Sequence, residues 1–416
     1  MPGRLFAISV VKKLVEAGHI AYFAGGWVRD FLMKHPSDDI DIATSASVEE
    51  VQALFPKTIP VGISFGIVIV VEGGHHFEVA TFRKEAGYFD GRRPTQVLRA
   101  TPEEDARRRD FTINGMFWDP LKEKLFDYVG GERDLKKGIV RAIGNPHERF
   151  FEDRLRMMRA VRYSTRFDFP IEAETQQAIL DHADALLPAV AMERIWQEFK
   201  KMSQFAHFDK GLIALHELHL LQTIFPTLKE ISTEEIRNRV ARLDFFPKNA
   251  PTISELLDLF PNESLEQLLE LCEYLKLSKQ EKDLASFLHH AKQLLQMPDA
   301  WLQKLEKIEW AHFYANTIAD LALHIHAAHL NDEKKEQFLN EHLLRRRQLE
   351  QAVTRITTGR PLVNADALMQ EGILPGKNMG LLLKEAERIS VNASIEDPKI
   401  IIQMLKKTSL WQTSEK

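Results

Sequence analysis

The chain has 416 residues, 44% hydrophobic and 28% charged, with a net charge of −5. These values are typical of a globular protein with more than one domain, and no apolar run approaches the length of a membrane span. The single cysteine, Cys272, excludes an intrachain disulfide and a cysteine-ligated zinc site, and no signal-peptide pattern is present. We therefore expect a cytoplasmic protein without a membrane partner.

Strands and helices alternate in the first third of the chain. Helical spacing, alternation of apolar residues and a Ser47/Glu50 capping box define the expected elements. In chain order they are a helix at Leu5–Glu16, strands at Ala21–Ala24 and Asp39–Ala43, a helix at Ser47–Phe55, and a hairpin of Gly66–Val71 with Phe77–Phe82 around Gly73-Gly74.

Residues 25–44, GGWVRDFLMKHPSDDIDIAT, are the most informative stretch. On a strand, Asp39 and Asp41 would share one face while Ile40 and Ile42 point into a core. Two carboxylates that close repel each other, and Mg²⁺ is a cation that suits such ligands and usually also binds substrate phosphates. An isolated Asp-x-Asp more often marks a solvated strand end. Here, however, it follows a strand–Gly-Gly–helix turn, which can bring backbone N–H groups near a phosphate, and Arg29 lies in that helix. The stretch therefore predicts phosphoryl transfer with a nucleotide.

Two further features follow the hairpin's first strand. Glu78 alternates with Phe77 and Val79 and is a plausible third carboxylate, although a solvent-facing strand glutamate gives the same pattern. Residues 83–94, RKEAGYFDGRRP, have the composition of a mobile loop beside it, and an ordinary solvated hairpin excursion is the alternative. The residues that characterise this segment are Arg83, Tyr88, Asp90, Arg92 and Arg93.

Two later motifs are rich in arginine. In RRRDFTIN (107–114), Arg109 could hold a triphosphate and Asp110 could accept from ribose hydroxyls, while a surface charge run is the alternative. In EDRLRMMRAVR (152–162), the residues Asp153, Arg156, Arg159 and Arg162 form a stripe that drifts around a helix. Arginines this close repel each other unless an anion lies among them, so the stripe indicates either a nucleotide site or a solvated basic face.

From about residue 150 onward the pattern is helical. Expected helices include Phe151–Phe167, Ala173–His182, Ala191–Met202, Lys279–Gln296, Ala311–Leu330 and Lys334–Arg355. The chain is thus predicted to be an α+β protein, with a mixed α/β head followed by an all-α remainder.

The ordered motifs GG-x-V-R-D, D-I-D-I-A-T-S-A, F-E-V-A-T-F-R, R-R-D-F-T-I-N and E-D-x-x-R resemble those of the bacterial class II nucleotidyltransferases, which are tRNA CCA-adding enzymes and their poly(A) polymerase relatives. The match is strong through about residue 205, and GILPGKNMGLLLKEAE (372–387) resembles a segment of the family's helical body. The resemblance implies a polymerase-β-like head with a mixed or antiparallel sheet (1–140), a helical neck that recognises the base (141–205), and a helical body and tail that bind RNA (206–416).

The resemblance also implies roles for the matched residues. Asp39 and Asp41 would hold two Mg²⁺ ions, with Glu78 as the third catalytic carboxylate. The nucleotide, ATP or CTP, would be bound by Gly26, Arg29, Arg109, Asp110, Asn114, Asp153, Arg156, Arg159 and Arg162, and residues 83–94 would be the family's flexible loop. The expected reaction is addition of CCA to the 3′ end of tRNA.

Three alternatives remain open at this point. A poly(A) polymerase, or a tRNA nucleotidyltransferase that adds only the terminal A, would use the same chemistry. The C-terminus is only modestly basic, with Lys406, Lys407 and Lys416, which favours tRNA as the substrate. A non-catalytic RNA-binding protein is the remote alternative, because such a protein would be expected to lack a carboxylate or a triphosphate-binding residue. RNA contacts in the body could involve Arg345–Arg347 and Lys377, although an exposed helix face is the alternative for the arginine triplet. No DNA partner is expected, and the sequence does not indicate an oligomeric state.

Overall fold

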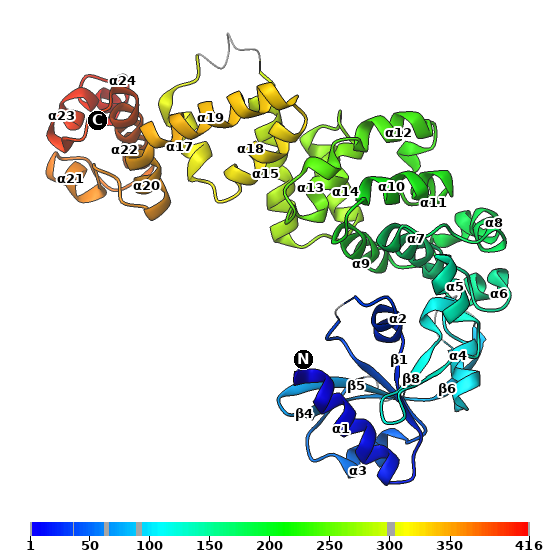
Figure 1. Cartoon of the computed structure of the whole chain (residues 1–416). Helices are drawn as coiled ribbons and strands as arrows, with labels where there is room; N and C mark the ends of the chain where they lie inside the picture. The colour runs from blue at the N-terminus through cyan, green and yellow to red at the C-terminus, as the bar shows by residue number, and fades with distance from the viewer. Residues whose placement is uncertain (1, 36, 62–65, 89–93, 298–303, 415–416) are drawn as a thin grey trace. The chain divides into compact units, whose positions relative to one another are not determined.

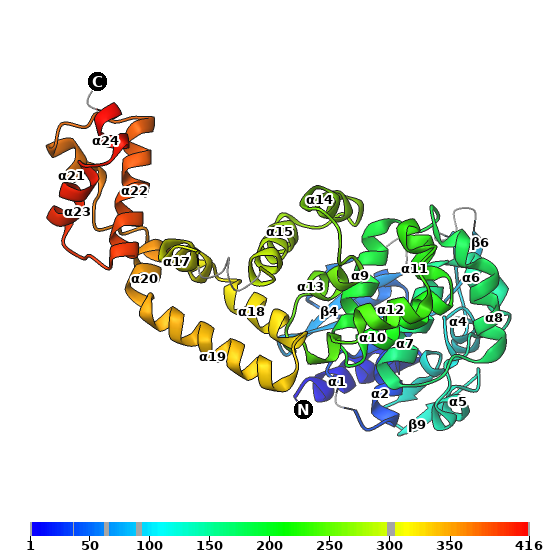
Figure 2. The same cartoon turned by 90° about the horizontal axis from the view of Figure 1, so that it is seen from above.

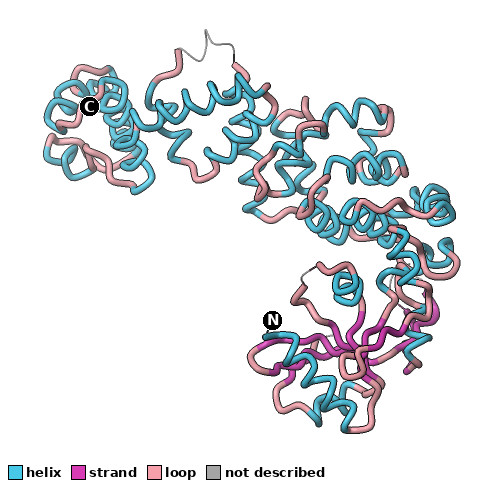
Figure 3. The backbone as a smooth tube through the Cα atoms, in the orientation of Figure 1, coloured by secondary structure: helices cyan, strands magenta, loops and turns pink. Residues whose placement is uncertain are grey.

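The computed structural model describes residues 2–35, 37–61, 66–88, 94–297 and 304–414. The chain divides into two compact units, Met1–Asp244 and Phe245–Lys416. All strands of the described part lie in the first unit, and the second unit is helical (Figure 3). The predicted α+β class is therefore confirmed, while the three-part division at residues 140 and 205 stays a prediction.

A seven-stranded mixed sheet forms the centre of the N-terminal part. Its order is β3-β4-β5-β2-β1-β8-β9, in which β2 and β5 are parallel and the other neighbours are antiparallel. The strands are β1 (Ala21–Ala24), β2 (Asp41–Thr44), β3 (Thr58–Pro60), β4 (Ile67–Glu72), β5 (His75–Thr81), β8 (Phe117–Asp119) and β9 (Lys124–Phe126).

The two faces of this sheet differ in character. Helices α1 (Pro2–Glu16) and α3 (Val48–Leu54) cover one face, where Leu14, Ile42 and Val79 belong to a common buried core (Figure 1). Since side chains alternate along a strand, Asp41 and Glu78 belong to the opposite face. The register pairs Ile42 with Val79 across the parallel strands, so these two carboxylates occupy neighbouring positions.

Local sequence signals place the turns around this sheet. Ser47 and Glu50 form the predicted capping box at the start of α3. Helix α2 (Gly26–Leu32) directly follows β1, and Gly25 links them with a φ of 67° and a ψ of −137°. This backbone region suits glycine because it has no Cβ. The predicted strand–glycine–helix turn is therefore present.

Residues 83–94 are more regular than expected. Their N-terminal arm is strand β6 (Arg83–Tyr88), which pairs antiparallel with β7 (Pro94–Arg99) in a separate two-stranded sheet. Arg83 and Tyr88 lie in β6, whereas Asp90, Arg92 and Arg93 lie outside the described residues. The expectation of a loop is therefore wrong for residues 83–88, and the mobility of the segment stays a prediction.

The expected single helix at Phe151–Phe167 is two helices. Helix α6 (Pro146–Glu152) ends at Asp153, whose φ of −147° and ψ of 105° are extended, and α7 (Leu155–Phe167) begins two residues later. The Asp153 side chain accepts a hydrogen bond from the Leu155 backbone N–H at 3.1 Å, as in an N-terminal cap. The break places Asp153 in front of the arginine-bearing helix instead of on it.

The remaining α-helices of the first unit lie between strands β7 and β8 or after the last strand. They are α4 (Pro102–Arg107), α5 (Gly131–Lys137), α8 (Ala173–His182), α9 (Met192–Ser203), α10 (Phe208–Glu217), α11 (Leu220–Ile224) and α12 (Thr233–Val240).

The second unit is a chain of packed helices (Figure 2). The expected helix at Ala311–Leu330 is split into α17 and α18, and the one at Lys334–Arg355 is split into α19 and α20. The helices are α13 (Thr252–Leu256), α14 (Leu265–Tyr274), α15 (Lys279–Leu295), α17 (Lys307–Ala315), α18 (Ala319–Ala328), α19 (Asp332–Gln348), α20 (Glu350–Thr358), α21 (Ala365–Gln370), α22 (Lys377–Ala393), α23 (Pro398–Leu405) and α24 (Ser409–Ser414). No helix in the described ranges is long and apolar enough to cross a membrane.

Candidate active site

A polar cavity of about 980 Å³ lies in the first unit, and the open face of the sheet and helix α7 both contribute to it. It brings together residues that are more than 130 positions apart in the sequence. Every residue predicted to be catalytic or nucleotide-binding lines it: Gly26, Arg29, Asp39, Asp41, Glu78, Arg109, Asp110, Asn114, Asp153, Arg156, Arg159 and Arg162. The cavity is therefore the candidate active site.

One end of the cavity carries the carboxylates of the sheet. Burial is the largest of the effects that raise the pKa of Asp41 to about 7; the charges of Glu78 and Asp39 act in the same direction, while Arg109 opposes them. A carboxylate in such surroundings would be stabilised in its ionised form by a further cation. The all-oxygen donor set at a cavity wall fits Mg²⁺, which prefers hard ligands and keeps coordination positions for substrate phosphates.

Glycines leave room next to these carboxylates. A Cβ atom added to Gly25 would lie 3.6 Å from Asp41 Oδ2 and 3.4 Å from Arg109 Nη1. One added to Gly26 would lie 3.4 Å from the Arg29 guanidinium. These are ordinary van der Waals distances, so space alone would admit a Cβ atom; glycine is required at Gly25 by its φ of 67°, which residues with a Cβ rarely adopt.

Arg29 lines the cavity but is almost fully buried. It is 2% exposed and donates to Asp30 Oδ1 from Nε at 2.9 Å and to Asn114 Oδ1 from Nη1 at 2.5 Å. Its guanidinium also lies over the rings of Tyr163 and Phe167, at 5.3 and 4.6 Å from their centroids. In this conformation Arg29 holds Asn114 and the aromatic wall in place.

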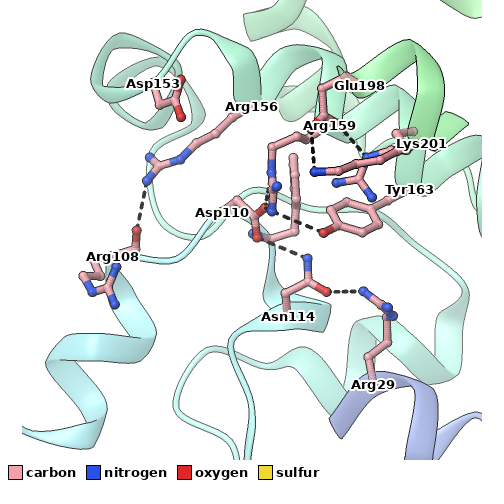
Figure 4. Close-up of polar contacts among 12 residues, drawn as sticks. Arg29, Arg108, Asp110, Asn114, Asp153, Arg156, Arg159, Tyr163, Glu198 and Lys201 are labelled. Carbon is pink, nitrogen blue, oxygen red and sulfur yellow. Dashed lines mark hydrogen bonds and ion pairs between the residues drawn. The ribbon is translucent and has the colours of Figure 1, made fainter. Parts of the chain in front are cut away.

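A hydrogen-bonded chain continues from Asn114 to helix α7 (Figure 4). Asn114 Nδ2 donates to Asp110 Oδ1 at 3.2 Å, and Arg159 Nε donates to Asp110 Oδ2 at 2.8 Å. Although burial acts in the opposite direction, the Arg159 guanidinium holds the pKa of Asp110 at about 2. Asp110 is therefore ionised and fixes Arg159 and Asn114 relative to each other.

The stripe of arginines on α7 is neutralised by carboxylates, both from a neighbouring turn and from remote segments. Arg162 Nε donates to Glu198 of α9 at 2.6 Å, and Arg156 Nη1 donates to Glu152 at 2.6 Å. Asp153 is held by Arg194, whose Nη1 and Nη2 donate to its two oxygens at 3.2 and 2.8 Å. The mutual repulsion expected among these arginines is thus relieved by the protein itself, before any nucleotide binds.

Sequence reasoning missed several residues that organise the cavity. Asp105 is 1% exposed and accepts from Arg108, from Arg109 and from the Arg83 backbone N–H, which ties the β6–β7 hairpin to the cavity wall. Arg108 and Arg109 follow Asp105 by three and four residues, at and just beyond the end of α4, and this spacing was a usable signal. No local pattern pointed to Glu198 or Arg194, because their partners are far away in the sequence.

A second group of potential cation ligands lies outside this cavity. In the described part of the chain, His207, Asp209 and Asp244 bring three ligand atoms within 4.8 Å of one another. Asp39, Asp41 and Glu78 are not gathered as tightly. The sequence did not indicate the group at His207.

The chain matches known family models and curated relatives in sequence. Residues 21–141 match the model described as the poly A polymerase head domain, and residues 168–232 match the one described as the probable RNA and SrmB-binding site of polymerase A. The CCA-adding enzyme of Pediococcus pentosaceus is 34% identical over 403 residues, which cover 95% of this chain and 96% of that enzyme. The CCA-adding enzyme of Anoxybacillus flavithermus is 45% identical over 230 residues, 55% of this chain and 56% of that enzyme.

The fold is similar to that of a solved relative over its whole length. The crystal structure of the Bacillus stearothermophilus CCA-adding enzyme in complex with CTP superposes with a TM-score of 0.81 at 28% sequence identity, and the match covers 99% of each chain.

Proposed function

This chain belongs to the family of CCA-adding enzymes, and we propose that it adds C and A, from CTP and ATP, to the 3′ end of tRNA without a nucleic-acid template. The observation that supports this most directly is the gathering of all twelve predicted site residues around one cavity. A non-catalytic RNA-binding protein would have no need for both a carboxylate cluster and a nucleotide-sized arginine wall.

Asp153 and Arg156 would select the base. Cytosine and adenine share an edge in which an exocyclic amine lies next to a ring nitrogen that accepts a hydrogen bond. The bonds of Asp153 to Arg194 and to the Leu155 N–H use three of about four carboxylate acceptor sites. Asp153 therefore keeps one acceptor for the amine.

Arg156 supplies the complementary donors. Its guanidinium bonds Glu152, the Arg149 carbonyl and the Arg108 carbonyl, which uses three of five N–H groups. A remaining N–H can donate to the ring nitrogen. Uracil and guanine would present a carbonyl oxygen to Asp153 and an N–H to Arg156, and a buried mismatch of this kind is heavily penalised. One carboxylate–guanidinium pair would thus accept both C and A.

Asp39 and Asp41 would hold Mg²⁺ beside the α-phosphate, with Glu78 as the neighbouring carboxylate. Bound there, the metal would lower the pKa of the RNA 3′-hydroxyl and neutralise charge on the leaving group. The hydroxyl oxygen forms a bond to the α-phosphorus, the bond to the β-phosphate oxygen breaks, and pyrophosphate leaves. Arg109, beside Asp41, would contact the triphosphate, while Arg29 would position Asn114 and Asp110 near the ribose.

The remaining parts of the cavity would support the nucleotide indirectly. Arg159 and Arg162 are anchored by Asp110 and Glu198 and would form the wall against which the nucleotide lies. A poly(A) polymerase or an A-adding enzyme would use the same wall, and the relatives named above favour complete CCA addition. Location in the cytoplasm stays a prediction from the sequence.

Product sequencing tests the proposal. The purified chain is incubated with Mg²⁺ and all four NTPs on tRNA transcripts that end at the discriminator base, at C and at CC, beside an unstructured RNA. We expect addition of CCA, CA and A to the three transcripts, and then termination. Extension of only the CC-ended transcript by one A would make it an A-adding enzyme, and long A tails on every RNA would make it a poly(A) polymerase.

A further inference from the structure

A second cavity, of about 430 Å³, lies within the helical second unit. Helices α17 and α19 and the C-terminal end of α22 line it. Its lining residues are Leu305, Lys307, Trp310, Arg345, Gln348, Leu349 and Ser394. The lining thus contains two cations, two neutral polar side chains and no carboxylate.

Both cations are held by neutral groups. The Arg345 guanidinium lies over the Trp310 ring, 4.5 Å from its centroid, and Arg345 also hydrogen-bonds the hydroxyl of the buried Tyr314. Lys307 Nζ donates to Ser394 Oγ at 2.9 Å. No carboxylate of the described residues forms an ion pair with either.

This arrangement differs from the active-site cavity, where the arginines of α7 are matched by carboxylates. Glu306, the nearest acidic residue in sequence to Lys307, is paired with Arg388 at 2.5 Å instead. Lys307 and Arg345 are therefore fixed in position while their charges remain available. A positive pocket whose side chains are already ordered loses little entropy when an anion binds.

We infer that this pocket binds a backbone phosphate of the RNA substrate, with Arg345 and Lys307 as its cationic ligands. The inference rests on the proposed function. A guanidinium and an ammonium fit phosphate oxygens, and Gln348 and Ser394 supply neutral polar groups for the adjoining sugar. The pocket is larger than a free phosphate requires, and it offers no groups arranged to read a base, as expected for a contact that holds any tRNA regardless of sequence.

The test measures tRNA affinity of Arg345→Gln and Lys307→Gln by fluorescence anisotropy between 50 and 200 mM KCl. Each variant should bind tRNA roughly 5- to 10-fold more weakly, with a salt slope reduced by about 1 per lost phosphate contact. The KM for tRNA should rise while kcat and the KM for CTP stay unchanged. Arg360→Gln is the matched control, because Arg360 is an exposed arginine of the second unit that does not line the pocket.

Three outcomes would overturn the inference. The first is a tRNA affinity and a salt slope equal to those of the wild type in both pocket variants, provided that circular dichroism shows both to be folded. The second is an equal loss in Arg360→Gln, which would indicate a diffuse charge effect. The third combines two results: inorganic phosphate raises the melting temperature of the wild type but not of Arg345→Gln, and Arg345→Gln binds tRNA as the wild type does. This combination would assign the pocket to a free anion. If the wild type itself extends no tRNA, the proposed function fails; if it does and the variants bind normally, only the pocket assignment fails.

Discussion

Replacing Asp153 tests the base-reading pair most directly. In Asp153→Asn the amide oxygen can keep the bonds from the Leu155 N–H and from Arg194 Nη1, while the amide NH₂ takes the place of Oδ2. A donor then stands where the base amine was accepted. We expect the variant to incorporate UTP, because uracil presents a carbonyl oxygen at that position.

The magnitude follows from the hydrogen bond that is lost. A bond to a charged group contributes about 1.5–3 kcal/mol, so kcat/KM for CTP should fall roughly 10- to 150-fold. The new hydrogen bond to uracil should raise kcat/KM for UTP. The ratio of kcat/KM for CTP to kcat/KM for UTP should therefore change by more than either kcat/KM does. Asp153→Ala should lower CTP use by a similar factor without the gain for UTP. Arg194 is partly exposed, so losing its partner should cost only about 1 kcal/mol of stability.

The assay is single-nucleotide extension of a tRNA transcript with each NTP in turn. Glu148→Ala is the matched control, because Glu148 is an exposed acid on the same helix as Glu152 and does not line the cavity. A CTP-to-UTP ratio in Asp153→Asn that stays at the wild-type value, in a protein that melts normally, would refute protein-directed base selection.

Three further changes have defined outcomes. Asp39→Ala or Asp41→Ala should abolish incorporation without lowering the melting temperature, since the Asp41 carboxylate is destabilised in the fold; normal turnover would disprove the metal assignment. Arg29→Lys should lower the free energy of unfolding by about 2–4 kcal/mol in guanidinium unfolding. The reason is that an ammonium cannot hydrogen-bond Asp30 and Asn114 at the same time while lying against two rings. An unchanged midpoint of guanidinium unfolding would contradict the structural role of Arg29. Burial raises the pKa of Asp258 to about 7, so the folded state favours the protonated form and stability is lost as pH rises from about 4 to 7. Asp258→Asn should match the wild type near pH 4 and exceed it above pH 7 by up to about 4 kcal/mol; a constant difference in unfolding free energy across that range would contradict this.

Local patterns were sufficient for the elements that depend on neighbours in sequence. The capping box of Ser47 and Glu50 and the glycine turn before α2 formed as expected, because each depends on residues within a few positions of one another. The same holds for the alternation that buries Ile40 and Ile42 and leaves Asp39 exposed. The ordered motifs, through their resemblance to a known family, then predicted which side chains would line one cavity.

The interior of single helices was less predictable. The helical spacing of apolar residues continues across Asp153 and therefore predicted one helix. In the structure, the side chain of Asp153 accepts a hydrogen bond at the start of α7 and binds Arg194 of α9. A capping side chain interrupts a helix without changing the apolar period on either side of it, so the period alone could not locate the break.

Sequence alone determined which chemical groups this protein has and in what order: two aspartates after a glycine turn, a third carboxylate, and arginines at helical spacing. The tertiary structure decided how those charges are compensated. It pairs Arg159 with Asp110 and Arg162 with Glu198, and it leaves Arg345 and Lys307 with neutral partners. The reason is that charge compensation depends on distance in space, and the residues that compensate one another here are 36 or more positions apart in the chain.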